Sequence, residues 1–293
     1  MKTLPLSFYP SLLLLFALIH TATADRLLDT TFSNFEIWMG IPHASTEGLP
    51  PGTFQSSNVT QGIFMGLNAD VKNVFQLIEE NDELVLHISG EIYGGLTTIK
   101  SYQNYHLTLQ FRWGEKKWPP RLYALRDSGL LYHCHVPHGA FWNVWKASLE
   151  FQVQESDLGD FIPLAGTKAS IRHTHLEGIK RARFDPDSTQ RTNGYISAWP
   201  EPDAPHGKWN QLDLYTWGDF SAHIVNGEVV MVVEKAKNKA GAPLTSGQIQ
   251  LQSEAAECYY KNIEINPITQ LPDSVLTFLK KHNYTIPRES NEP

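Results

Sequence analysis

The residues best suited to chemistry lie in a short segment of alternating character, SLEFQVQESDLGD, at residues 148–160. Glu150, Gln152 and Gln154 are separated there by single apolar residues. Successive side chains of a β-strand point to opposite faces, so a carboxylate and two amides share one face and the apolar residues share the other. A carboxylate held among hydrogen-bond donors can act as a general acid or base. Glu150 is therefore the leading catalytic candidate, and Gln152 and Gln154 are candidates for binding a polar substrate.

The same segment allows a second kind of chemistry. Glu150-x-Gln152-x-x-Glu155 has the spacing of the E-x-D-x-x-E motif found in retaining β-glucanases of jelly-roll fold, with an amide in place of the middle acid. Retaining hydrolysis needs two carboxyl groups roughly 5 Å apart. Glu155 can be the second carboxyl only if the strand bulges. A two-carboxylate glycoside hydrolase using Glu150 and Glu155 is therefore an alternative function.

Histidines at alternate positions could bind a metal ion or transfer protons. His133 and His135 flank one residue, and so do His173 and His175. Two such side chains of a strand share a face roughly 7 Å apart at their Cα atoms, and imidazole is a common metal ligand. We expect His133 and His135 to hold one divalent metal ion or to be acid–base partners of Glu150. Histidines that only hydrogen-bond the substrate, or that have no role, are the alternatives.

Three further side chains are predicted to contact the substrate. Arg112 and Lys100 are cations that could stabilise a carbonyl or enolate oxygen. The ring of Trp142 could pack against the C–H face of a sugar. Arg126 and Asp127 are interpreted as an ion pair in a loop. No nucleophile elbow, phosphate-binding glycine loop or dinucleotide fingerprint is present, which argues against the common hydrolase, kinase and dehydrogenase classes.

These residues must be positioned by strands, because alternating patterns recur along the whole chain. Asn226-Gly227 between two such runs predicts a tight hairpin. Residues 272–283 predict one short amphipathic helix. The pattern as a whole is typical of an all-β sandwich or jelly roll. The predicted strands lie within residues 83–90, 105–114, 128–139, 148–155, 168–175, 208–219, 220–235 and 247–268.

Composition narrows the class of protein. The chain has 293 residues, a formal net charge of −7 and two cysteines, so it cannot depend on a disulfide framework. A mildly acidic chain without a basic stripe is a poor nucleic-acid binder. We therefore expect no nucleic-acid partner. The eight tryptophans and eleven tyrosines, whose rings suit the C–H faces of sugars, favour an oligosaccharide or glycoside as substrate.

The N-terminal 24 residues are typical of a secretory signal peptide. Lys2 precedes the apolar stretch 12–19, and Ala22-Thr23-Ala24 forms a small-residue cleavage site. The apolar stretch is shorter than the roughly 20 residues that a membrane span needs, so we expect no membrane insertion. The prediction is an exported protein, in the bacterial periplasm or outside the cell, with one domain over 25–270 and a C-terminal tail with a short helix over 271–293.

Four segments together resemble the 3-keto-disaccharide hydrolase domain family, formerly a domain of unknown function. They are DSGLLYH (127–133), LEFQVQE (149–155), KWNQLDLYTWGDFSAHIVNGEVV (208–230) and GQIQLQSEAAECYYKNIEINPI (247–268). The last segment is similar to the closing signature of the family, with Tyr-Lys where relatives often carry Phe-Arg. The resemblance covers about residues 28–268. It implies a concanavalin A-like jelly roll, a fold that this family shows in many exported bacterial proteins.

The resemblance also implies a reaction. A ketone at C3 of the sugar acidifies the hydrogen on C2, a carboxylate or imidazole removes it, and the group on C1 leaves by elimination or hydrolysis. This route needs a base, an enolate stabiliser and an acid, and it tolerates Gln152 in place of a second carboxylate. A non-catalytic carbohydrate-binding module is a further alternative, because the family includes many different activities.

Overall fold

The computed structural model describes residues 24–286. The predicted signal peptide, apart from its last residue, lies outside this range, as do residues 287–293. Within residues 24–286 no helix is long and apolar enough to cross a membrane.

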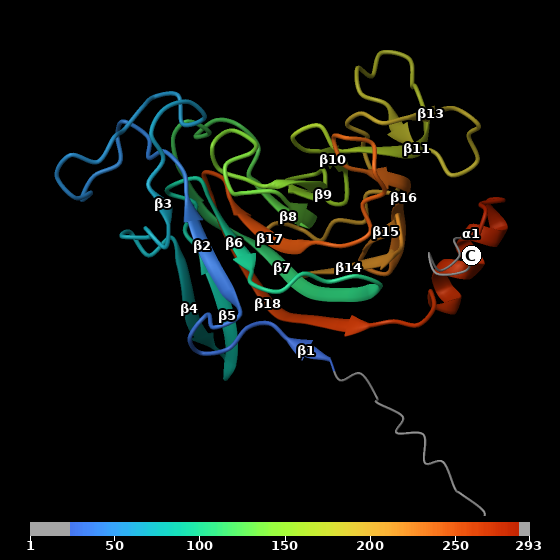
Figure 1. Cartoon of the computed structure of the whole chain (residues 1–293), viewed down its shortest axis with the longest axis horizontal. Coiled ribbons are helices and arrows are strands. Elements are labelled where there is room, and N and C mark those ends of the chain that lie inside the picture. Colours follow the sequence, from blue (N-terminus) through green and yellow to red (C-terminus); the bar gives the residue numbers. More distant parts are fainter. Residues whose placement is uncertain (1–23, 287–293) are drawn as a thin grey trace, which may run out of the picture.

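Two antiparallel sheets form a sandwich, which confirms the predicted all-β jelly-roll class (Figure 1). The strands of the larger sheet are, in spatial order, β12 (Arg183–Phe184), β11 (Lys168–Thr174), β16 (Glu228–Lys237), β15 (Phe220–Val225), β14 (Asn210–Trp217), β7 (Tyr105–Lys117), β18 (Ala256–Pro267), β5 (Glu83–Ile88) and β4 (Phe75–Glu80). Two short strands pair at its side, β1 (Asp25–Arg26) with β18 and β13 (Arg191–Thr192) with β11.

The smaller sheet carries the segment with which the sequence analysis began. In spatial order its strands are β10 (Phe161–Pro163), β9 (Ala147–Gln154), β8 (Asp127–His135), β17 (Gln248–Ser253), β6 (Gly94–Thr98), β2 (Phe35–Met39) and β3 (Gly66–Leu67). β8 therefore lies between β9, which follows it in the chain, and β17, which is far from it in sequence.

The core lies between the sheets and follows the predicted alternation. Leu149, Phe151 and Val153 of β9 are fully buried in the same hydrophobic cluster as Leu107 and Phe111 of β7. Their burial leaves the alternate residues of β9 on the outer face of the smaller sheet. The predicted orientation of this strand is confirmed.

Two local predictions are also confirmed. Asn226 and Gly227 have φ values of 49° and 87° and connect β15 to β16, as the favoured hairpin turn requires. The predicted helix is α1 (Asp273–Lys281), which buries Val275 and Leu279.

The predicted alternation of β8 is wrong beyond Tyr132. A β-bulge lies between Tyr132 and His135, and His133 has a φ of 50°. An extra residue in one strand reverses the faces of those that follow. Cys134 therefore packs with Leu131 in a second apolar cluster, while the ring of His133 lies against that of Tyr132. Cys134 and Cys258 are both buried free thiols.

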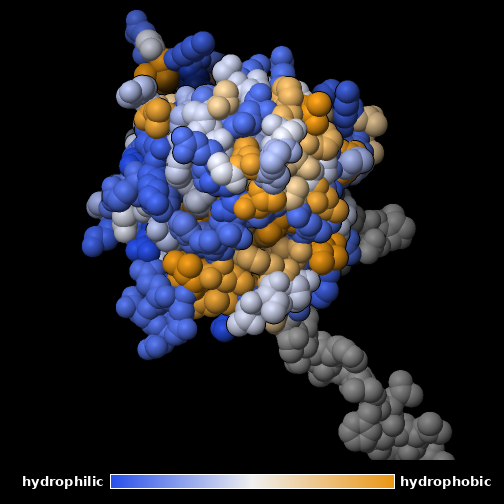
Figure 2. All heavy atoms as spheres, turned by 90° about the vertical axis from the view of Figure 1, so that its left-hand side faces the viewer, coloured by the Kyte–Doolittle hydropathy of each residue, from blue (hydrophilic) through white to orange (hydrophobic). Residues whose placement is uncertain are grey.

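Figure 2 shows the side of the molecule at the left of Figure 1, where the connection between β2 and β3 lies. Hydrophobic side chains gather there in patches between hydrophilic ones. Phe54, Ile63 and Phe64 are exposed residues of that connection.

Candidate functional site

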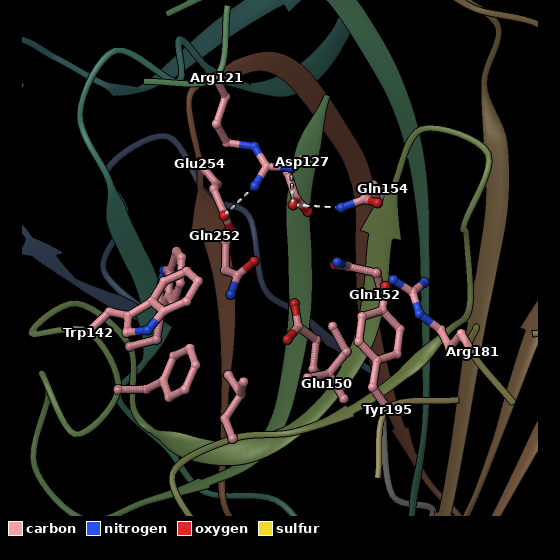
Figure 3. Close-up of a pocket in the computed structure, with 14 residues that line it drawn as sticks. Arg121, Asp127, Trp142, Glu150, Gln152, Gln154, Arg181, Tyr195, Gln252 and Glu254 are labelled. Carbon is pink, nitrogen blue, oxygen red and sulfur yellow. Dashed lines mark hydrogen bonds and ion pairs between the residues drawn. The ribbon is translucent and has the colours of Figure 1, made fainter. Parts of the chain in front are cut away.

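A cavity of about 330 Å³ opens on the outer face of the smaller sheet (Figure 3). Strands β9, β8 and β17 supply its floor, and loops supply its walls. Its polar lining consists of Arg121, Asp127, Glu150, Gln152, Gln154, Arg181, Gln252 and Glu254. Its apolar and aromatic lining consists of Phe141, Trp142, Trp145, Ile162, Leu164 and Tyr195.

The centre of the floor is Gly129 of β8, which faces Gln152 of β9 across the ladder. A Cβ atom on Gly129 would lie 2.3 Å from Oε1 of Glu150 and 2.4 Å from Oε1 of Gln252, closer than any non-bonded contact allows. The missing side chain is therefore what lets a carboxyl group from β9 and an amide from β17 approach each other over β8.

Glu150 is buried, with 3% of its surface exposed. No hydrogen bond or ion pair joins its carboxyl group to another residue within 24–286. Burial, and then the negative charge of Asp127, raise the pKa of Glu150 well above its usual value. The group is therefore protonated over a wider pH range than an ordinary glutamate, and its oxygens are free to meet a substrate.

Arg121 connects the other two carboxyl groups of the cavity. Its guanidinium lies 2.6 Å from Oδ2 of Asp127 and 3.3 Å from Oε1 of Glu254. Gln154 also donates a hydrogen bond of 2.7 Å to Asp127. Burial nevertheless raises the pKa of Asp127 to about 6, and burial and the charge of Asp127 raise that of Glu254 well above its usual value. One cation balances a single negative charge, so one of these carboxyl groups keeps a proton.

Two side-chain amides flank Glu150. Oε1 of Gln152 accepts the backbone N–H of Val153 at 3.0 Å, which leaves its NH2 group pointing into the cavity (Figure 3). Oε1 of Gln252 is buried without a hydrogen-bond partner among the described residues. Gln252 lies across Gly129 from Glu150, since Oε1 of each falls within 2.4 Å of the same Cβ position.

Aromatic rings wall the cavity on both sides. Phe141 and Trp142 are stacked, with centroids 4.7 Å apart and planes at 24°, and Trp142 is 45% exposed. On the opposite side the guanidinium of Arg181 lies 3.5 Å from the centroid of Tyr195. Flat apolar rings around a polar floor suit a sugar, which presents C–H faces and hydroxyl edges.

The structure brings together four of the eight predicted site residues: Glu150, Gln152, Gln154 and Trp142. The predicted placement of Arg112 and Lys100 near them is wrong. Arg112 lies on β7 of the other sheet and pairs with Glu80 at 2.7 Å. Lys100 is exposed and lies 3.4 Å from Asp25.

His133 and His135 do not reach the cavity either, because the bulge in β8 turns them away. The buried ring of His133 lies 6.2 Å from that of Tyr105, and burial followed by the charge of His135 lowers its pKa to about 3. His135 donates a 3.0 Å hydrogen bond from Nδ1 to the carbonyl of His133. Within residues 24–286 no group of three or more His, Cys, Asp or Glu residues is arranged to hold a metal ion. His133 and His135 therefore belong to no such group there.

Two other expectations are corrected. Glu155 pairs with Arg126 at 2.9 Å and does not line the cavity, so it does not face Glu150 as the two-carboxylate alternative requires. Asp127, interpreted from sequence as the partner of Arg126, pairs with Arg121 instead.

Several cavity residues were not predicted. Gln252 belongs to the alternating run QIQLQSE, whose row of polar residues resembles that of β9. This alternation could have identified Gln252 from the sequence. Arg121, Glu254, Arg181 and Tyr195 come from loops or strand ends, where no periodic pattern marks them.

The comparison that decides the family covers most of the chain. The sequence model of the 3-keto-alpha-glucoside-1,2-lyase-like domain matches residues 33–266. The chain belongs to this family. The predicted family is thereby confirmed, and the protein acts on carbohydrates. No curated protein sequence matches the chain.

Solved structures with similar folds include a Parabacteroides distasonis protein provisionally described as a glycosyl hydrolase (17% identity, 67% of this chain and 84% of that chain, TM-score 0.41). A carbohydrate-binding module of Bacillus subtilis is 10% identical (64% and 89%, TM-score 0.37). The Bacillus licheniformis β-glucanase is 6% identical (85% and 99%, TM-score 0.39). These distant similarities add nothing to the functional argument.

Proposed function

We propose that the protein cleaves 3-keto-glycosides by removing the proton from C2 and expelling the substituent of C1. The C2–H electron pair forms an enolate with the C3 carbonyl. When the carbonyl re-forms, a double bond appears between C1 and C2 and the C1–O bond breaks. The leaving oxygen takes a proton, and the sugar is released as an unsaturated ketone to which water can then add.

The observation that carries this proposal is the free, buried carboxyl group of Glu150. Its two competitors in the cavity, Asp127 and Glu254, are both held by Arg121. A carbon-bound proton needs a stronger base than an ordinary carboxylate, and the raised pKa of Glu150 supplies one. Glu150 is therefore the base. The rate rises with pH, because only the ionised form can accept the proton.

The remaining roles fall to its neighbours. The NH2 groups of Gln152 and Gln252 flank Glu150 and can donate hydrogen bonds to the enolate oxygen. The raised pKa of Glu254 makes it the proton donor for the leaving oxygen. Trp142 packs against the sugar. The predicted signal peptide supports a further part of the proposal, that the protein is exported and meets its glycoside in the periplasm or outside the cell.

The test is the Glu150→Gln variant, assayed with 3-keto-glucosides and 3-keto-trehalose by the absorbance of the unsaturated ketone. We expect turnover to be lost and the melting temperature to stay within a few degrees, because a neutral amide replaces a neutral acid of nearly equal size. Glu155→Gln is the matched control, since it removes a carboxylate of the adjoining segment outside the cavity. It should keep its activity.

Other results separate the alternatives. A Glu150→Gln variant that retains activity contradicts the assigned base. Cleavage of plain, unoxidised disaccharides by the wild type would indicate a conventional glycoside hydrolase. Binding of sugars without turnover of any of them would indicate a carbohydrate-binding module.

A further inference from the structure

A second cavity of about 480 Å³ adjoins the first. The two share Arg181 and Tyr195, which line both. The guanidinium of Arg181, packed on the ring of Tyr195, is therefore a wall common to both cavities. The other lining residues of the second cavity are His175, Lys180, Ala182, Thr192 and Ile196.

The two cavities differ in the charged side chains that line them. Three carboxyl groups line the first cavity, those of Asp127, Glu150 and Glu254. The lining of the second contains two cations, Lys180 and Arg181, and no carboxyl group. In the first cavity Arg121 and Arg181 accompany the carboxyl groups, whereas nothing in the lining of the second offsets its cations, which favours a negatively charged group of a ligand there.

Part of the charge of Arg181 remains available to a ligand. Its Nη1 lies 3.1 Å from Oδ2 of Asp160 and 3.9 Å from Oδ2 of Asp157. Asp160 is fully buried, and this burial raises its pKa to about 8 although the backbone N–H of Ala198 donates to it. At neutral pH Asp160 is therefore only partly ionised. Arg181 itself is 38% exposed at its side chain, so its guanidinium can reach a group in the cavity.

We propose that the second cavity binds a negatively charged group, a carboxylate or a phosphate ester, on the leaving part of the glycoside. This inference rests on the proposed function, because it assigns the substituent of C1 to the side of Arg181 and Tyr195. Arg181 positions the anion from the shared wall, and Lys180 adds a second cation of the lining. The substrate class is then a 3-keto-glycoside of a sugar acid, a hydroxy acid or a sugar phosphate.

Binding to the intact protein tests the inference without turnover. Isothermal titration with D-glucuronate, D-glucose 6-phosphate and D-glucose compares the two kinds of anion with a neutral sugar. We expect at least one anion to bind roughly tenfold more tightly than glucose. Lys180→Glu should remove this advantage and leave glucose binding unchanged. Lys100→Glu, which reverses the charge of an exposed lysine outside both cavities, is the matched control and should keep it.

Equal affinities for all three ligands, or an advantage that survives Lys180→Glu, would overturn the inference. A preference for only one anion identifies the charged group. Turnover separates this result from the proposed function. A 3-keto-glucoside of 4-hydroxybenzoate should have a lower KM than that of 4-hydroxybenzamide, its neutral counterpart. If neither is cleaved, the proposed reaction fails, while the titrations still decide whether the cavity binds anions.

Discussion

Gly129→Ala should abolish activity while leaving the fold intact, because the new methyl group would enter the centre of the cavity floor. It would lie 2.3 Å from Oε1 of Glu150 and 2.4 Å from Oε1 of Gln252. Both side chains would have to retreat by about 1 Å to reach an ordinary contact distance. Misplacing a reacting group by that much can cost roughly 100-fold in rate.

The cost in stability is much smaller. The atoms that must move are the ends of flexible side chains, and an off-rotamer conformation costs about 0.5–1.5 kcal/mol for each. Alanine in place of glycine in a strand returns about 0.5–1 kcal/mol. The net change is at most about 2.5 kcal/mol, which lowers the melting temperature of a chain of this size by roughly 10 °C at most.

The assay measures kcat/KM for a 3-keto-glucoside together with the melting temperature. Gly95→Ala is the matched control, since its Cβ would lie 2.5 Å from Nε2 of Gln250, a buried side chain bonded to Thr97 and outside the cavity. We expect Gly95→Ala to lose stability and keep its activity. Full activity in Gly129→Ala, or an equal loss in both variants, would refute the reasoning about the floor.

Two further predictions concern the buried charges. Arg121→Met should lower the free energy of unfolding by about 3–5 kcal/mol at pH 8, because it leaves Asp127 and Glu254 without their cation. The loss should be smaller at pH 5, where both carboxyl groups hold protons. Urea unfolding at the two pH values measures the difference. Glu150 keeps its proton to a higher pH in the folded protein than in the unfolded chain. Its contribution to the free energy of unfolding therefore falls as the pH rises above the ordinary pKa of a glutamate. The fall is about 1.4 kcal/mol per pH unit until the folded group ionises. Wild type and Glu150→Gln should therefore differ in the pH dependence of urea unfolding between pH 5 and 8, with the variant less sensitive; identical curves would contradict the raised pKa.

The sequence was sufficient for features that depend on local periodicity. The faces of β9, the hairpin at Asn226-Gly227 and the helix α1 each follow from alternation, turn chemistry or amphipathic spacing within a few residues. Glu150, Gln152 and Gln154 were found because one strand displays them all. The family resemblance then identified the sandwich to which that strand belongs.

What the sequence could not supply depends on contacts across strands. A bulge is not visible in the run YHCH, yet it removes His133 and His135 from the face that alternation predicts. Arg112 has the right chemistry for the site but belongs to the other sheet, and only strand order shows this. Arg121 reaches the cavity from a loop, and a loop sequence lacks the periodic pattern of apolar and polar residues from which a side chain's direction can be predicted.

The cavity combines features that stability alone would not favour. A carboxyl group without a partner is costly to bury, and an apolar residue or an amide at position 150 would cost less. A glycine at the centre of a strand also weakens it, yet Gly129 is what lets Glu150 and Gln252 approach. Function is expected at strand positions whose residues lower the stability of the fold in this way. Because both costs meet at one point on the floor, the same point is where we place proton abstraction.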